Sequence, residues 1–277
     1  MEPAIVVALL WTLFGVFHIG LATLRIRGCL VSRLGEVRFS LAYSAVALAT
    51  VSVVIVYYSQ HRSDNGAAGL ALAAIPAVRS LLIALIVASV MMMVAAFATY
   101  NHSPYAILGK SKFPEPRGLE RVTRHPFFVG FVIFSIAHML LATRLIGAAF
   151  VAGFGVIALV GMVHQDRKLA ARYGEAFLRH LEATSAVPFA AIIAGRQRMV
   201  WSELPVRHFA VAIALAIGLR AIHGSIFARE GGPFIAGTVV TLGVIGLQPL
   251  MRMKRRDEKQ DRERTSRPER SVLDARN

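Results

Sequence analysis

The sequence is poor in the residues on which soluble and disulfide-bonded domains depend. It contains one cysteine, Cys29, which excludes an intrachain disulfide framework and a thiolate zinc cluster. Only 17% of its 277 residues are charged, whereas 56% are hydrophobic. This composition excludes an ordinary soluble domain and predicts a polytopic membrane protein. Since thiolates are scarce, metal ligation would fall to histidine.

Long apolar segments are abundant, and seven of them approach the roughly 20 residues that cross a hydrocarbon core of about 30 Å. Residues 126–164 would form one helix of about 58 Å, so the chain must fold back, and Arg144 marks the bend. The first segment follows "MEP" without a basic leader, and we expect it to be a retained helix. The sequence therefore predicts an all-α integral membrane bundle of six to seven transmembrane helices. The segments are 3–24, 39–59, 77–99, 126–143, 145–164, 208–227 and 233–251.

Basic residues are concentrated in alternate connections. If the amino terminus lies outside, the inner loops 25–38, 100–125 and 165–207 hold sixteen Lys and Arg residues, against four in the outer connections. This bias predicts an external amino terminus, a cytoplasmic carboxyl terminus and a bacterial-type inner membrane. The net charge of +15 then faces anionic lipid and gives no ground for nucleic-acid binding. The tail 252–277 has almost nothing apolar to bury and is predicted to be disordered.

The longest inner connection predicts two surface elements. Apolar residues at i+4 spacing indicate an amphipathic helix. After it, Thr184 or Ser185 is expected to cap a short apolar helix that Pro188 starts and Gly195 ends. On the outside, the segment 67–76 is too short to span and is expected to cover the outer end of the bundle. The amphipathic residues are Leu169, Tyr173, Phe177 and Leu181.

Several histidines fall within apolar segments, where an ionisable side chain indicates a functional site unless it makes an interhelical hydrogen bond. Helical rise puts His18 about 22 Å below the outer surface and His138 about 20 Å above His125. His125 and His164 lie near the inner boundary. Two imidazoles from different helices can ligate haem iron, and His18 with His138 is one plausible pair, although their depths differ by about 11 Å. His61 or His223 paired with His138 would be closer in level, and these alternatives stay open.

Two further positions carry alternatives of their own. Arg124 and His125 precede Pro126, so they either make contacts at the start of a helix or take part in a site at the inner surface. Arg220 lies one turn before His223, and the two either make a structural polar contact or bind an anion.

Three stretches, "FHIGLATLR", "TRHPFFVGFVIFSIAHML" and "DRKLAARYGEAFLRHLEATSAVPFAAIIAGRQ", resemble the NnrU-domain family, which includes the plant 15-cis-zeta-carotene isomerases. The resemblance implies a membrane domain over 1–200, which a helical hairpin at 201–251 completes, followed by the tail at 252–277. It further implies haem b and, in the enzymes of the family, conversion of a central cis double bond of a polyene to trans. Bacterial members of the family are also linked to denitrification and nitric oxide metabolism.

The resemblance also implies a set of site residues. His18, His61 and His138 fall on histidines of the family, and His18 and His138 are the foremost haem ligands and catalytic candidates. The plant isomerases carry a cysteine one turn before the last of these, where this chain has Ser135. As a hypothesis, ferrous iron donates electron density to the polyene and lowers the bond order of the cis double bond. The implied partners are the lipid bilayer, a hydrophobic polyene and an electron donor, while the protein orients the cofactor.

Two other classes compete with this interpretation. "RHPFFVG" followed by "DRKLAARYGEAF" also resembles isoprenylcysteine and phospholipid methyltransferases, which implies that Arg124, His125 and Asp166 contact S-adenosylmethionine, with Phe128 in place of the usual tyrosine. The third class is non-enzymatic and comprises a haem-carrying membrane subunit or an anion transporter. The seven predicted spans do not divide into two matching halves, which argues against a transporter.

Overall fold

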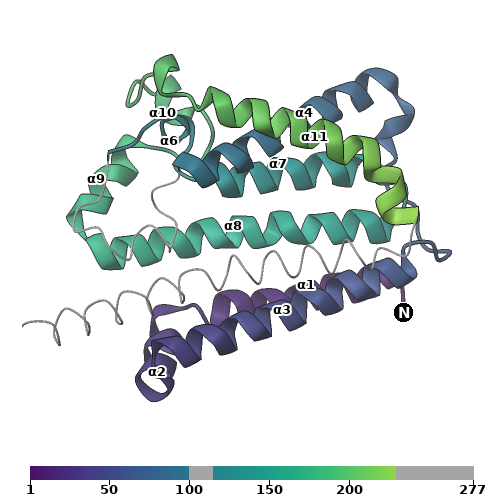
Figure 1. The fold of residues 1–277 in the computed structure, drawn as a ribbon, viewed down its shortest axis with the longest axis horizontal. Coiled ribbons are helices and arrows are strands. Elements are labelled where there is room, and N and C mark those ends of the chain that lie inside the picture. Colours follow the sequence, from purple (N-terminus) through teal and green to yellow (C-terminus); the bar gives the residue numbers. More distant parts are fainter. Residues whose placement is uncertain (100–114, 229–277) are drawn as a thin grey trace, which may run out of the picture.

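We describe the protein from a computed structural model, which defines residues 1–99 and 115–228. Within these ranges the chain is helical, and its longer helices lie side by side along one axis (Figure 1). The all-α class is therefore confirmed. These helices are α1 (Pro3–Gly20), α2 (Leu24–Leu34), α3 (Glu36–His61), α4 (Pro76–Thr99), α7 (Pro126–Leu141), α8 (Leu145–Tyr173), α9 (Glu175–Ala183) and α11 (Val206–Ala228). Single turns are η1 (Leu72–Ala74), α6 (Leu119–Val122), α10 (Ala190–Ile193) and η2 (Trp201–Glu203).

Five of the described helices are long and apolar enough to cross a membrane, namely α1, α3, α4, α8 and α11. The predicted span 126–143 is the shorter apolar helix α7, whose 16 residues run between Pro126 and the turn before Arg144. Arg144 is the N-cap of α8, as its place at the bend predicted. The predicted span 233–251 and the tail 252–277 lie outside the described residues. The orientation in the membrane and the domain boundaries remain predictions.

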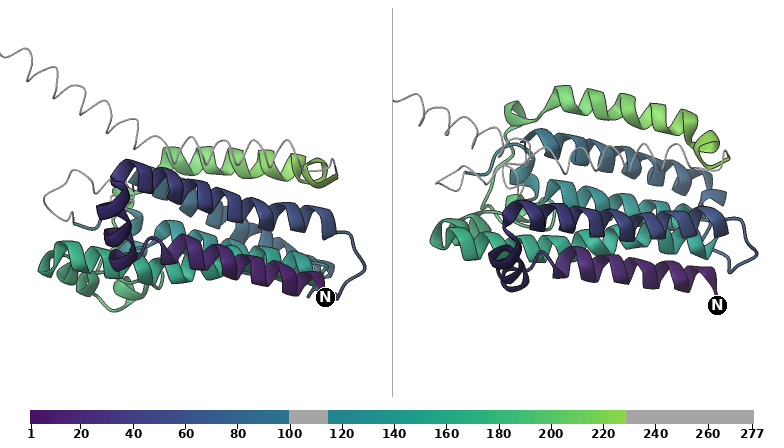
Figure 2. Two further views of the ribbon diagram at one scale, coloured as in Figure 1. Left: turned by 90° about the horizontal axis from the view of Figure 1, so that it is seen from below. Right: turned by 60° about the horizontal axis from the view of Figure 1, so that its bottom comes forward.

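Contacts between neighbouring helices follow the order α3, α1, α8, α7, α4 and α11, so that α8 and α7 occupy the middle of this sequence of contacts. The right-hand view of Figure 2 shows α11 on one side of the bundle with α4 next to it. Small residues on α8 allow this close packing. A Cβ atom added at Gly153 would lie 2.3 Å from the ring of Trp11 on α1, and one added at Gly155 would lie 2.9 Å from the Cβ of Ser135 on α7. Close approach at small residues is the usual means of helix association in lipid.

The outward faces of the spans are apolar. At most 28% of any span window is buried within the protein, and the value is only 6% for α11. Exposed side chains such as Leu9, Val156 and Ile217 are apolar along their whole length. Such faces are stable in hydrocarbon, which supports a bilayer as the surrounding solvent.

The two ends of the bundle differ. Helices α2, α6, α9 and α10 gather at the end opposite the amino terminus, here called the basic end, because the connections rich in Arg and Lys lie there (Figure 1). At the amino-terminal end, the segment 67–71 runs beside the turn between α7 and α8, where the Gly69 N–H donates to the Thr143 carbonyl at 3.0 Å. The segment thus packs on that turn, while its place on the outer side of the membrane remains a prediction.

The prediction of one continuous amphipathic helix over 169–181 is wrong. Gly174 adopts φ +52° and divides it, so that Leu169 belongs to α8 whereas Phe177 belongs to α9. The apolar face nevertheless remains continuous, because Leu169 and Phe177 are both buried in one cluster at the corner. The chain turns there to cover its own apolar surface.

The short helix after it also differs from the prediction. It is the single turn α10, which begins at Ala190, and Phe189 precedes it in a left-handed conformation with φ 63°. Gly195 ends the turn, as predicted. Thr184 does not cap this turn, because its hydroxyl donates to the carbonyl of His180 at 2.6 Å and closes α9 instead.

Candidate functional site

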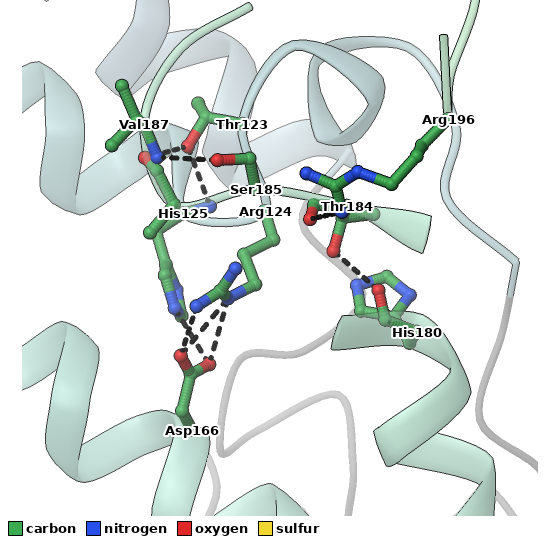
Figure 3. A network of polar contacts seen from close by, with 10 residues as sticks. Thr123, Arg124, His125, Asp166, His180, Thr184, Ser185, Val187 and Arg196 are labelled. Atoms are coloured by element: carbon green, nitrogen blue, oxygen red, sulfur yellow. Dashed lines mark hydrogen bonds and ion pairs between the residues drawn. The ribbon is translucent and has the colours of Figure 1, made fainter. Parts of the chain in front are cut away.

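A polar network ties the start of α7 to α8 at the basic end (Figure 3). Asp166 accepts hydrogen bonds from Arg124 Nε at 3.0 Å and from Arg124 Nη2 at 2.8 Å, and His125 Nε2 lies 2.9 Å from its other oxygen. Thr123 extends the network, because its hydroxyl donates to the Ala186 carbonyl at 2.8 Å. The network therefore joins three separate parts of the chain.

The burial of this network bears on the predicted contact with S-adenosylmethionine. The side chain of His125 is only 1% exposed, so it faces Asp166 inside the protein and presents no surface to a soluble cofactor. His125 directly precedes Pro126 at the start of α7. Contacts at the start of this helix were one of the two alternatives that the sequence left open for His125. An ion pair whose two partners are mostly buried holds the start of α7 in a fixed position on α8, because separation of the partners would leave an uncompensated charge inside the protein. Arg124 and His125 thus position α7.

A second polar link at the same end was missed by sequence reasoning. Glu203 accepts bonds from Arg121 Nε at 2.8 Å, from Arg121 Nη2 at 3.1 Å and from the Gly118 N–H at 2.8 Å. Mainly the Arg121 guanidinium, followed by the Gly118 N–H, lowers the pKa of the Glu203 carboxyl to about 2. Arg121 and Glu203 are 82 positions apart, and no spacing in the sequence signals their contact.

His18 lies near the end of α1, between aromatic rings. Its imidazole stacks on Phe14 and on Tyr43, with ring centroids 4.9 and 5.5 Å apart. The Tyr43 hydroxyl donates to the His18 carbonyl at 2.9 Å and lies 3.1 Å from Nδ1. His18 also lines a cavity of about 140 Å³ together with His164 and Lys168 of α8. From the sequence, His164 was placed only near the inner boundary, although its i,i+4 spacing to Lys168 puts both residues on one face of the helix.

His138 lies toward the other end, on α7. Its Nδ1 is 3.0 Å from the Phe134 carbonyl of the preceding turn. Ser135 beside it is 2% exposed, and its buried hydroxyl has no hydrogen-bond partner among the described residues. His61 ends α3, with Nδ1 2.9 Å from the Tyr57 carbonyl. His223 on α11 is exposed and close enough to His138 to interact electrostatically.

These positions test whether His18 and His138 fit one haem. Phe128 and His18 line the same cavity, whereas His138 follows Phe128 by ten positions on α7, which is about 15 Å of helix rise. Axial ligands must face each other across one iron atom. The cavity is comparable to one that holds a single benzene, at about 150 Å³, and a porphyrin is several times larger. His138 does not line this cavity, so the cavity beside His18 does not bring the two residues together.

The other candidate histidines do not form a metal site with neighbouring side chains among the described residues. Among the described residues, no three His, Cys, Asp or Glu side chains converge as a metal site would require. Each of His18, His61 and His138 has Nδ1 near an oxygen, an arrangement that orients metal-binding imidazoles elsewhere. Of the predicted alternatives, His223 is the one with an electrostatic interaction with His138. Haem ligation remains a prediction.

Comparison with known proteins places the chain among relatives. The sequence model of the family described as "NnrU protein" matches residues 6–230. The chain is 32% identical over 254 residues to "15-cis-zeta-carotene isomerase, chloroplastic" of Arabidopsis thaliana, which covers 90% of this chain and 61% of that protein. It is 32% identical over 249 residues to the protein of the same name from Zea mays, which covers 89% of this chain and 60% of that protein.

The chain thus spans about 60% of the length of these curated relatives. No solved structure is significantly similar to it. The match to the family includes the bundle from α1 to α11 and every candidate residue from His18 to His223. The chain belongs to the NnrU protein family.

Proposed function

We propose that the protein is an integral membrane isomerase that converts a cis double bond of a hydrophobic polyene to trans. The observation that carries this proposal is the 32% identity to two 15-cis-zeta-carotene isomerases, which extends over 90% of the chain for the Arabidopsis protein. The apolar outer faces of the helices agree with it, because a hydrocarbon substrate dissolves in lipid and would reach the protein from there.

Within this proposal, α7 is the helix to test first. It is flanked by α4 and α8 and carries His138 and Ser135 in an otherwise apolar sequence. A polar group inside a hydrocarbon-embedded bundle is costly unless it serves a purpose. The network of Arg124, His125 and Asp166 would contribute indirectly, because it holds the start of this helix at a fixed position against α8.

The proposal includes haem b because the family resemblance implies it. When bound, a haem iron would supply the electron density that weakens a double bond. The chain's own residues would bind and orient the polyene and exclude water. His138 is the foremost candidate ligand, with His223 as its nearer proposed partner, and His18 is tested separately because it lies at another level.

The test uses the full chain in detergent or vesicles, loaded with haem b and supplied with a cis-polyene in the presence or absence of reductant. Chromatography then measures the isomer ratio, and absorption spectra report the Soret band. We expect net conversion to trans by the wild type and loss of both signals in His138→Ala, with His208→Ala, at an exposed position near the start of α11, as the matched control. A Soret band without conversion would indicate the alternative, a haem protein of nitric oxide metabolism. Unchanged isomer ratios in every state would overturn the proposed activity.

The methyltransferase alternative has less support. Arg124 and His125, the residues that would contact S-adenosylmethionine, are instead bonded to Asp166, and His125 is buried. The distinguishing measurement is binding of S-adenosylmethionine by the purified chain. Binding that depends on Asp166 would favour this alternative over the isomerase. The bacterial-type inner membrane also stays a prediction, since both relatives are named as chloroplastic.

A further inference from the structure

Apolar side chains are exposed at the basic end, in the connection between α9 and α11 and at the first residue of α11. Figure 1 shows α10, which belongs to this connection, at that end of the bundle. Five side chains, here called the apolar patch, have exposed fractions between 51% for Phe189 and 84% for Ile193. Exposed apolar side chains that cluster in this way mark a surface that contacts another apolar phase or molecule. The patch consists of Val187, Phe189, Ile193, Trp201 and Val206.

Hydrogen bonds on its inner side hold the patch in place. The Phe189 N–H donates to the Val122 carbonyl at 2.8 Å. Close by, the Arg124 N–H donates to the Ser185 carbonyl, also at 2.8 Å. Phe189 has φ 63°, a left-handed conformation that is strained for a bulky side chain and persists only where surrounding contacts impose it. The connection therefore presents its apolar side chains outward as a fixed surface.

Basic side chains border the patch. Between residues 186 and 208 the chain carries three arginines, all exposed, and one acidic side chain, Glu203, which is paired with Arg121. Apolar and aromatic side chains with a cationic border are typical of segments that lie in the headgroup layer of an anionic membrane. The aliphatic groups and rings then enter the acyl boundary, and the guanidinium groups contact phosphate. The arginines are Arg196, Arg198 and Arg207.

The patch also adjoins the surface of the bundle that faces hydrocarbon. Val206 is the first residue of α11, and only 6% of the span window of α11 is buried within the protein. Trp201 lies in η2, directly before this helix. Tryptophan is enriched at the boundary between hydrocarbon and headgroups, because its ring is apolar whereas its N–H needs a polar partner. This continuity with a lipid-facing helix favours a membrane over a soluble protein as the partner of the patch.

We propose that the apolar patch inserts into the headgroup layer of an anionic membrane and lies at the boundary with the acyl chains. The segment thereby adds an interfacial contact to the transmembrane helices and fixes the basic end relative to the membrane surface. The proposal goes beyond the isomerase activity, since no residue of the patch takes part in the proposed reaction. Its test needs neither haem nor polyene, so its failure and the failure of the proposed function are distinguishable.

Fluorescence of Trp201 tests the insertion, because the chain has two tryptophans and Trp11→Phe leaves Trp201 as the only indole. The full chain is reconstituted in vesicles of phosphatidylglycerol and phosphatidylcholine, with bromine at a shallow or a deep position of the phosphatidylcholine acyl chains. We expect shallow bromine to reduce the Trp201 emission by roughly half or more, and deep bromine to reduce it less. Iodide on both sides of the membrane should leave most of the emission.

Two results would overturn the proposal. Quenching by iodide without quenching by bromine would place Trp201 in water, and resistance to both quenchers would show that protein covers the patch. If Trp11→Phe does not fold, the difference between the spectra of the wild type and Trp201→Phe supplies the same measurement.

Variants separate insertion from simple attraction of a basic surface to anionic lipid. Ile193→Glu places a carboxylate at the most exposed position of the patch and should reduce the quenching by shallow bromine about twofold or more. The matched control Ile75→Glu, at an exposed position directly before α4, should leave it unchanged. Arg198→Gln should weaken the dependence on phosphatidylglycerol more than Arg33→Gln, which alters an exposed arginine of α2 at the same end. Equal effects within either pair would contradict a specific interfacial surface.

Discussion

Replacement of Gly153 by alanine should separate α1 from α8. The added Cβ would lie 2.3 Å from three atoms of the Trp11 indole, whereas ordinary contact begins at 3.4 Å, so the helices must move apart by about 1 Å. Overpacking of this kind costs about 1–3 kcal/mol. The same movement threatens the hydrogen bond from Trp11 Nε1 to the Phe150 carbonyl, now 3.0 Å long, which contributes about 1 kcal/mol.

Gly147→Ala is the matched control, because it lies on the same helix and its added Cβ would meet nothing closer than 3.8 Å. Both variants gain similar helix propensity, of about 1 kcal/mol. That gain cancels in the comparison, and Gly153→Ala should be less stable than Gly147→Ala by about 2–4 kcal/mol.

Thermal unfolding of the detergent-solubilised protein measures the difference, with Trp11→Leu as the second mutation of a double-mutant cycle. The penalty of Gly153→Ala should shrink in the Trp11→Leu background, because the ring that it strikes is gone. If Gly153→Ala melts at or above the temperature of Gly147→Ala, the packing of α1 on α8 described here is incorrect.

Two further predictions concern the basic end. Asp166→Asn should destabilise the protein by about 3 kcal/mol, because Arg124 and His125 lose their shared carboxylate, and thermal unfolding against the exposed control Arg167→Gln checks this. The pKa of Glu203 is about 2 in the folded protein and 4.5 ordinarily, so its contribution to stability is present above pH 4.5 and is lost as the pH falls toward 2. Glu203→Gln should flatten this part of the stability profile, and an unchanged profile would show that the ion pair with Arg121 does not matter.

The helices were predictable because their apolar runs are long. Five span-length helices, and α7 between them, begin within three residues of the predicted segments, since in lipid an apolar run of that length must close its own hydrogen bonds as a helix. The exception at the other end is α8, which continues to Tyr173, nine residues past the predicted end at 164. The break at Gly174 was not predictable from periodicity. The i+4 pattern continues from Leu169 to Phe177 without interruption, because the two residues pack on each other around the corner.

The polar contacts were predictable only where the sequence offered a motif. The stretch that contains Arg124 and His125 drew attention to Asp166, and the three side chains do meet. The contact between Arg121 and Glu203 depends instead on how two loops fold over the end of the bundle, and nothing local encodes that arrangement.

Depth along the bundle explains why the two foremost histidines must be considered separately. Helical rise from the sequence put His18 and His138 about 11 Å apart in depth, and Phe128, which lines the cavity beside His18, precedes His138 by ten positions of α7, or about 15 Å of rise. Axial ligands must face each other across one iron atom, so a pair of His18 and His138 would require their side chains to meet between these levels. Each therefore needs its own explanation. For His138 we propose chemistry on a hydrocarbon in the apolar part of α7, whereas the His18 imidazole lies between the rings of Phe14 and Tyr43. His18→Ala and His138→Ala therefore test the pair directly: if only one of the two variants loses the Soret band, the two imidazoles do not share one iron.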